Sequence, residues 1–235
     1  MPVTVKAPLR PFEYMAWAKA VPEGARYNLT ASGMTDGALS EPHGVLPAPN
    51  APFDPAAELS WADAMSRRDV AWDSVESLTR AVSERYDVDP DLVTPTLGAS
   101  LAITHVLIAL VRAGDHVVVE RPTYEPLHRA PEILGAQVSR LERTLDDGWS
   151  VVPERLAQLL TSRTKAVLLN NPLNPAGKVF SREELSLIAE FVDGSDAYVI
   201  ADEVYEHVLY DGREHIPFST LPGMAERVIR IGSAG

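Results

Sequence analysis

The stretch Lys165-Ala-Val-Leu-Leu-Asn-Asn-Pro-Leu-Asn-Pro-Ala-Gly-Lys-Val-Phe-Ser-Arg-Glu-Glu-Leu185, together with Ala197-Tyr-Val-Ile-Ala-Asp-Glu-Val-Tyr205, decides the fold. Its apolar runs at 165–169 and 197–201 are typical of strands that are buried on both faces of a sheet. Between them, Ser181 and Glu184 have the spacing of a capping box, and apolar residues recur after them at helical spacing. A strand, a helix and a second strand of these lengths predict a parallel βαβ unit.

The same alternation extends from this unit in both directions. A β-branched run predicts a further strand at residues 116–120, and residues 137–141 and 227–231 are also predicted to be strands. Helical spacing predicts further helices at 100–112, 124–134 and 153–160, and one that begins with a capping box at Asp73 and Glu76 and stops at Pro90. An Asp211-Gly212 pair predicts a turn. The sequence therefore predicts an α/β fold with three layers, αβα, around a mainly parallel sheet.

Residues 1–60 do not follow this alternation. They contain many prolines and few periodic apolar positions, apart from a helix-like stretch at residues 12–20. We expect an N-terminal arm with a short helix over residues 1–60, followed by one large domain over residues 61–235.

The composition limits the classes of function. The chain has 235 residues and a net charge of −12, which disfavours a nucleic-acid partner. The absence of cysteine excludes disulfides, thiolate metal sites and thiol nucleophiles, and the six histidines show no metal-ligand spacing. No apolar run reaches the length of a membrane span and the first residues do not form a signal peptide, so we expect a cytoplasmic protein that contains no metal and does not bind a membrane.

Ligands of an open parallel sheet bind beyond the carboxyl ends of its strands, so the loops after the strands are the places to search. The loop Thr96–Ser100 opens a predicted helix, where Gly98, Ala99 and Ser100 allow a phosphate to approach free backbone N–H groups. The alternative is an ordinary capped helix start. Ser233, after the last predicted strand, offers a second hydroxyl beside a phosphate-sized gap.

Three other loops offer polar or aromatic groups for a planar ligand. Tyr124 can stack on a ring, or it is a core tyrosine that begins the next helix. Asn174, in a turn with two Asn-Pro pairs, can donate to a phenolate oxygen, or it serves the turn alone. Asp202 can keep a pyridine nitrogen protonated with Tyr205 donating from the other side, or it is a solvent-exposed acid at a strand end.

These five loops, in this order, resemble the motifs of fold-type I pyridoxal-phosphate (PLP) enzymes, and especially the class I and II aminotransferases similar to kynurenine, aromatic and aspartate aminotransferases. The resemblance covers residues 73–235 and is most specific in the run from Asn174 to Leu185. It implies that residues 61–235 are an incomplete PLP-binding domain, that a C-terminal small domain lies beyond the sequence, and that the protein is a homodimer. An Ala71-Trp72-Asp73 run stands where the family often has the tyrosine that contacts the partner subunit's phosphate.

The resemblance also assigns roles residue by residue. Gly98, Ala99, Ser100 and Ser233 would bind the PLP phosphate, and Tyr124 would stack on the ring. Asn174 and Tyr205 would hydrogen-bond the phenolate oxygen, and Asp202 would pair with the pyridinium nitrogen. The Schiff-base lysine would follow Gly235 directly, because none of Lys6, Lys19, Lys165 and Lys178 has the required place in the pattern. Gly33 lines the substrate side or is a turn glycine.

The activity that the resemblance implies is amino-group transfer from an L-amino acid to a 2-oxo acid. Other enzymes with the same PLP core are alternatives: a C–S β-lyase, a cyclising synthase or an amino-acid oxidase. A PLP-binding regulator is a third class, but residues 1–60 contain neither a helix-turn-helix pattern nor a basic patch. The arginine that would bind the substrate carboxylate lies beyond the sequence, so the sequence does not specify the substrate.

Overall fold

The computed structural model describes Glu13 and residues 70–233 of the chain. Glu13 and residues 96–233 belong to one compact unit, and residues 70–95 belong to another. Glu13 is helical, as the helix-like stretch at residues 12–20 predicts. The rest of the predicted N-terminal arm, including Gly33, lies outside the described residues.

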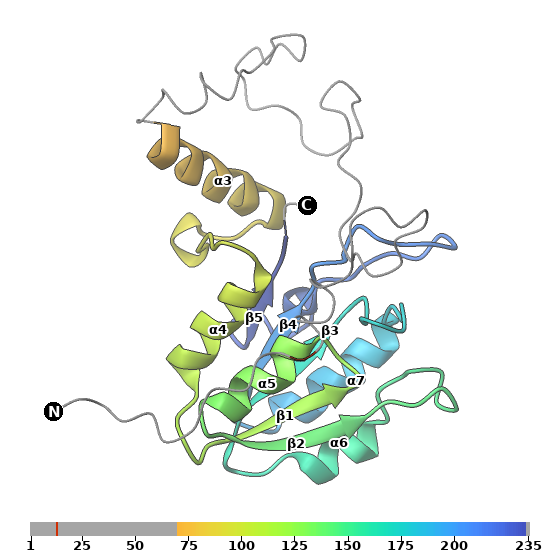
Figure 1. The fold of residues 1–235 in the computed structure, drawn as a ribbon. Helices are drawn as coiled ribbons and strands as arrows, with labels where there is room; N and C mark the ends of the chain where they lie inside the picture. Colours follow the sequence, from red (N-terminus) through yellow and green to blue (C-terminus); the bar gives the residue numbers. More distant parts are fainter. Residues whose placement is uncertain (1–12, 14–69, 234–235) are drawn as a thin grey trace, which may run out of the picture. The chain divides into compact units, whose positions relative to one another are not determined.

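The larger unit is built on a five-stranded sheet in which every neighbouring pair is parallel. The strand order is β2-β1-β3-β4-β5, so the chain crosses over the sheet between strands rather than forming hairpins (Figure 1). The strands are β1 (His116–Arg121), β2 (Gln137–Glu142), β3 (Thr164–Asn170), β4 (Tyr198–Asp202) and β5 (Val228–Ile231). Each lies within one residue of its predicted position, which confirms the mainly parallel α/β sheet.

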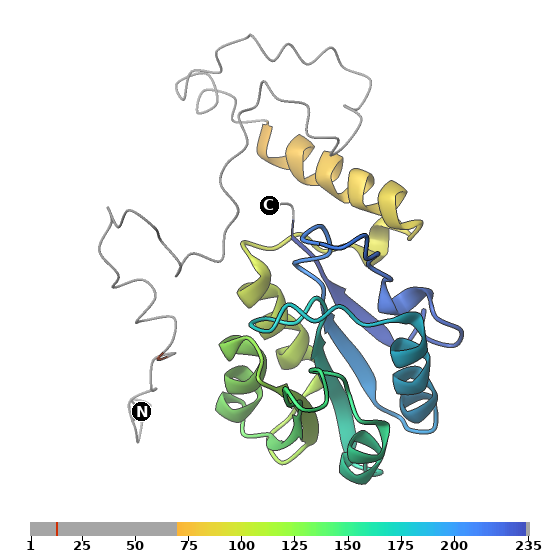
Figure 2. The same cartoon turned by 90° about the vertical axis from the view of Figure 1, so that its right-hand side faces the viewer.

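Helices cover both faces of this sheet (Figure 2). Residues of α4 (Ala99–Leu110) and α5 (Glu125–Ile133) form one core cluster with Val117, Val119 and Leu168. Residues of α6 (Pro153–Leu159) and α7 (Arg182–Asp193) form a second cluster with Val118, Val167 and Leu169. Successive residues of a strand point to opposite faces, so each apolar strand contributes to both cores and the predicted three layers are confirmed.

Helix α7 begins where the sequence predicts. The Ser181 hydroxyl accepts the Glu184 N–H at 3.2 Å, and the Glu184 carboxylate accepts the Ser181 N–H at 2.7 Å. This reciprocal pair fixes the direction in which the chain leaves the loop before α7.

The smaller unit is described over α3 (Val70–Tyr86) and a 3₁₀ turn, η1 (Pro90–Leu92). The prediction that Asp73 is the N-cap of α3 is wrong, because Asp73 and Glu76 lie inside the helix. Residues 70–72 include neither glycine nor proline, so no helix-breaking residue prevents the helix from beginning before Asp73. The helix ends before Pro90, as predicted, and Asp87 adopts a φ of 51° just after it.

Two short elements complete the larger unit. Asp211 and Gly212 form the predicted turn, with φ values of 57° and 67°. A 3₁₀ turn, η2 (Phe218–Thr220), then leads the chain towards β5. Among the residues that the structure describes, no helix combines the length and the apolar character needed to cross a membrane.

Candidate functional site

The carboxyl ends of the strands meet at one edge of the sheet. Asn170, the last residue of β3, pairs in register with Asp202 at the end of β4, and Asp202 pairs with Ile231 at the end of β5. The loops that contain Asn174, Tyr205 and Ser233 therefore begin side by side. This edge is where an open parallel sheet binds its ligands.

Asp202 is the most unusual acid at this edge, because only 1% of its surface is exposed. Burial raises the pKa of its carboxyl to about 6, with a smaller contribution from the neighbouring Glu203, while the Val204 N–H opposes the rise. That N–H donates to Asp202 Oδ1 at 3.3 Å. The alternative of a solvent-exposed strand-end acid is therefore wrong. A buried carboxyl of this kind is suited to a cationic partner, which would favour its ionised form.

The loop before α4 has the geometry of an anion site. Gly98 is the N-cap of the helix with a φ of 90°, a conformation that residues with a side chain rarely adopt. Thr96 Oγ1 donates to the Gly98 carbonyl at 3.1 Å and so stabilises the turn. The first N–H groups of the helix, which begins at Ala99, have no acceptor within it. The Ser100 hydroxyl lies in the same first turn, 2.9 Å from the hydroxyl of Tyr124.

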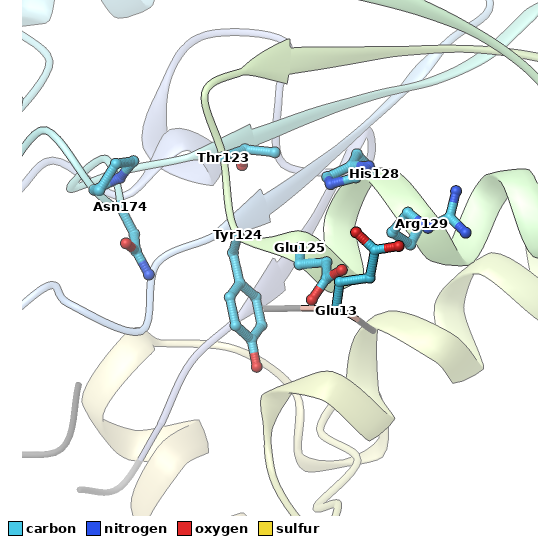
Figure 3. Close-up of a pocket in the computed structure, with 8 residues that line it drawn as sticks. Glu13, Thr123, Tyr124, Glu125, His128, Arg129 and Asn174 are labelled. Atoms are coloured by element: carbon cyan, nitrogen blue, oxygen red, sulfur yellow. The ribbon is translucent and has the colours of Figure 1, made fainter. Parts of the chain in front are cut away.

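Tyr124 and Asn174 line a cavity of about 560 Å³ at this edge (Figure 3). Its other walls include Thr123, His128 and Glu13. Thr123 Oγ1 and His128 Nδ1 are buried polar atoms with no hydrogen-bond partner among the described residues. The cavity therefore combines a phenol ring, an amide and unsatisfied polar groups, as expected for a small polar ligand with a flat ring.

Comparisons with known proteins agree with this geometry. The family model for aminotransferase class I and II matches residues 66–232. The chain belongs to this family. Human kynurenine–oxoglutarate transaminase 1 is 42% identical over 160 residues, which are 63% of this chain and 38% of that protein. Kynurenine–oxoglutarate transaminase from Dictyostelium discoideum is 38% identical over 181 residues, 68% of this chain and 41% of that protein.

Solved aminotransferases have the same fold over the shared region. N-succinyldiaminopimelate aminotransferase from Mycobacterium tuberculosis is 36% identical with a TM-score of 0.60, over 62% of this chain and 38% of that one. Aromatic aminotransferase from Pyrococcus horikoshii is 31% identical with a TM-score of 0.63, over 67% of this chain and 44% of that one. The chain thus spans about two fifths of the length of these relatives.

Class I and II aminotransferases depend on PLP, and the residues at the edge of the sheet fit that cofactor. The buried Asp202 carboxyl suits a protonated ring nitrogen, the start of α4 suits a phosphate, and Tyr124 offers a ring for stacking. Tyr205 is half-buried and lies in the turn that follows β4. The Val208 N–H donates to the Tyr205 carbonyl at 2.8 Å and closes this turn. Ser233 lies two residues beyond β5 and is exposed.

Asn170 holds Asn174 in place, although this role was not predicted from the sequence. Asn170 is 1% exposed, and its Oδ1 accepts the Asn174 N–H at 2.5 Å. Its Nδ2 donates to the Asp202 carbonyl at 2.9 Å. The signal for this role was the pair Asn170-Asn171, which follows the apolar run of β3. Both side chains are buried, and a buried polar side chain at this place must form hydrogen bonds with its neighbours.

A group of charged residues around the Tyr205 turn was also missed. The Arg230 guanidinium contacts Glu203 Oε2 through Nε and Glu206 Oε2 through Nη2, each at 2.5 Å. His215 Nε2 lies 3.2 Å from Glu203 Oε2. One arginine on β5 therefore binds both acids that flank Tyr205, which ties this turn to the strand leading to Ser233.

Neither of the two lysines among the described residues lines the cavity beside Tyr124 and Asn174. Lys165 is the second residue of β3, at the opposite edge of the sheet. The side chain of Lys178 is 21% exposed, and its ammonium lies 2.9 Å from Glu184. The capping-box acid of α7 is therefore also the ion-pair partner of this lysine. No group of three or more histidines or acids among the described residues is arranged to hold a metal ion.

Proposed function

We propose that this chain is the cofactor-binding part of a PLP-dependent aminotransferase that moves an amino group from an L-amino acid to a 2-oxo acid. The observation that supports this most directly is the buried Asp202 carboxyl at the end of β4. It shares one edge of the sheet with the open start of α4 and with the cavity beside Tyr124 and Asn174. The similarity to named transaminases supports the reaction class.

When bound, PLP supplies an aldehyde that takes up the amino group and a ring that withdraws electrons from the substrate α-carbon. Asp202 would hold a proton on the ring nitrogen, because its buried carboxylate is stabilised by a cation there. Asn174 and Tyr205 would donate hydrogen bonds to the phenolate oxygen and keep it ionised. Tyr124 would cover one face of the ring and exclude water from it.

The phosphate of PLP would bind at the start of α4. Free N–H groups of the first turn, near Ala99 and Ser100, and the positive end of the helix favour an anion there. Ser233 would provide a hydroxyl from the loop after β5. We place the Schiff-base lysine directly after Gly235. Borohydride reduction of the PLP-loaded full-length protein, followed by peptide mass spectrometry, locates the modified residue, and a label on Lys165 or Lys178 would contradict this placement.

The amino donor and acceptor are proposed by class only. Relatives of this chain are named for kynurenine, oxoglutarate and aromatic substrates, and these are the first compounds to test. The deciding experiment incubates the full-length protein and PLP with single L-amino acids and 2-oxoglutarate, and measures glutamate by chromatography. Glutamate formed with loss of the donor supports transamination, whereas ammonia and an oxo acid without glutamate would indicate a lyase.

We also propose a homodimer and a cytoplasmic location. The dimer is supported by apolar side chains at the start and along the outer side of α4, where Leu97, Leu101 and Ile108 are 93%, 37% and 53% exposed. A second copy would remove these side chains from water. Sedimentation of the full-length protein measures its mass, and a monomer at working concentration would contradict the dimer. Fractionation of the source cells tests the location.

A further inference from the structure

Glu120 and Arg143 form an ion pair inside the larger unit. Glu120 lies near the carboxyl end of β1, and Arg143 follows β2 directly. Arg143 Nη1 lies 2.5 Å from Glu120 Oε2, and both side chains are 0% exposed. Two charges removed from water cost more free energy than an apolar pair of the same size, so such a pair is weak evidence for a role in stability alone.

Two other groups contact Arg143 and restrict its orientation. Its Nε donates to the Trp149 carbonyl at 2.6 Å, and its guanidinium lies 4.5 Å from the centre of the Phe180 ring. Trp149 has a φ of 61°, and its N–H donates to the Thr144 carbonyl at 2.8 Å, which closes the loop that presents the Trp149 carbonyl to Arg143. The guanidinium is therefore held in one orientation beneath the carboxyl edge of the sheet.

The other oxygen of Glu120 is the acceptor that connects this pair to the candidate site. Glu120 Oε1 accepts the backbone N–H of Asn170. The side chain of Asn170 then contacts both neighbouring loops: it accepts the Asn174 N–H at 2.5 Å and donates to the Asp202 carbonyl at 2.9 Å. Glu120, Asn170 and Asp202 come from adjacent strands, so the contacts run continuously along the edge of the sheet.

We propose that the buried Glu120–Arg143 pair positions Asn174 and the end of β4 at Asp202 by fixing the backbone and side chain of Asn170. This inference rests on the proposed function, in which Asn174 and Asp202 contact the cofactor. Glu120, Arg143 and Asn170 are positioning residues, since they reach the cofactor groups only through Asn174 and Asp202.

The charges in this region support such an arrangement. Burial raises the pKa of Glu120 to about 7, and Arg143 is the strongest group acting in the opposite direction. The negative charge of Asp202 raises the pKa of Glu120 further, so the two acids interact across β3. Arg143 thus lowers the pKa of Glu120 relative to burial alone and favours the anionic form, which accepts the Asn170 N–H beside a second buried acid.

The test compares two neutral replacements of the pair in the full-length protein. Glu120→Leu with Arg143→Met removes the acceptor of the Asn170 N–H, whereas Glu120→Gln with Arg143→Met keeps an oxygen there. We expect the Leu/Met variant to exchange the amide hydrogen of Asn174 about 10-fold or more faster than wild type, and to bind PLP about 10-fold more weakly, because a buried hydrogen bond is lost. The Gln/Met variant should restore slow exchange at Asn174.

A matched control removes an ion pair that lies outside this network. Arg140 Nη2 and Glu132 Oε1 are 3.1 Å apart and partly exposed, and Arg140→Met with Glu132→Leu should leave exchange at Asn174 unchanged. If the Leu/Met variant does not fold, Asn170→Ala keeps the ion pair and should accelerate exchange at Asn174 in the same way.

The outcomes separate this inference from the proposed function. Wild-type exchange at Asn174 in both the Leu/Met and the Asn170→Ala variants would overturn the positioning role. If exchange at Asn174 is faster in the Leu/Met variant and equally fast in the Gln/Met variant, the charges of the pair, and not the acceptor oxygen, control this exchange. That result would also overturn the positioning role. A wild-type protein that does not bind PLP would overturn the proposed function, while the exchange result would still decide on the positioning of Asn174.

Discussion

The hydroxyl groups of Ser100 and Tyr124 lie 2.9 Å apart and join the first turn of α4 to the residue that precedes α5. The two residues are 24 positions apart in the chain. This contact holds the Tyr124 side chain beside the start of α4. A ring stacked on Tyr124 and a phosphate at α4 are therefore compatible with one PLP molecule.

Removing the Tyr124 hydroxyl should weaken cofactor binding without abolishing it. Tyr124→Phe keeps the ring but loses the contact with Ser100, and a net hydrogen bond of about 1 kcal/mol corresponds to an increase in the PLP dissociation constant of about 5-fold. Tyr124→Leu also loses the aromatic ring and should bind PLP more weakly than Tyr124→Phe. Fluorescence titration measures both constants, and equal affinity in the two variants would contradict stacking on this residue.

Replacing the buried acid should reduce turnover far more than binding. Asp202→Asn cannot hold a proton on the ring nitrogen as an ionised acid does, so we expect kcat to fall on the order of 100-fold or more, as for other preorganised electrostatic contacts. Asp202→Glu keeps the charge with a longer side chain and should retain more activity than Asp202→Asn. Steady-state kinetics of the full-length protein measures this, and near-normal turnover of Asp202→Asn would contradict the role of Asp202.

The same substitution should stabilise the protein without PLP at neutral pH. The pKa of Asp202 is raised in the fold to about 6, so the folded state binds a proton more tightly than the unfolded state, and this contribution to stability is lost as pH rises from about 4 to about 6. The side chain of Asp202→Asn does not titrate. The free energy of unfolding of this variant should therefore exceed that of wild type by an amount that grows over this pH range, to on the order of 3 kcal/mol. Urea unfolding at several pH values measures the difference, and a constant difference would refute the raised pKa.

The ion pair of Glu120 and Arg143 should show strong coupling in stability. Each single change, Glu120→Leu or Arg143→Met, leaves an unpaired buried charge and should cost about 3–5 kcal/mol. The double variant contains no charge and should be much closer to wild type, since two buried charges are replaced by apolar groups. A double-mutant cycle by chemical denaturation measures the coupling. Additive single effects would show that the pair does not interact as the structure describes.

The strands and the loops at their ends could be predicted because each has a local cause in the sequence. The residues Val117–Val119 alternate between two apolar cores, so an unbroken apolar run indicates a strand covered on both faces. The rule that ligands bind at the carboxyl ends then selects the loops without knowledge of any contact. Asp202 and Tyr124 were found in this way.

The contacts between loops could not be predicted from the same signals. Glu120 and Arg143 are 23 residues apart, and they meet only because β1 and β2 are parallel with Arg121 opposite Glu142. The register of parallel strands depends on packing over the whole sheet, and a single sequence does not specify it. The start of α3 was predicted wrongly for a local reason. Asp73 and Glu76 have the spacing of a capping box, but the residues before them include no helix breaker, so the helix begins earlier, at Val70.

The conformation of Gly98 gives a test of the anion site at α4. A Cβ at this position meets no atom within 4 Å, so Gly98→Ala causes no clash, but a φ of 90° is strained for alanine. The backbone should relax and turn the first N–H groups of α4 away from their present direction, which would weaken PLP binding about 10-fold for a loss of about 1.4 kcal/mol. Gly194→Ala is the matched control, because its φ of −70° suits alanine and its Cβ would make only ordinary contacts. Free phosphate should compete with PLP in the control but less effectively in Gly98→Ala. Equal PLP and phosphate affinities in the two variants would show that the start of α4 does not bind the phosphate.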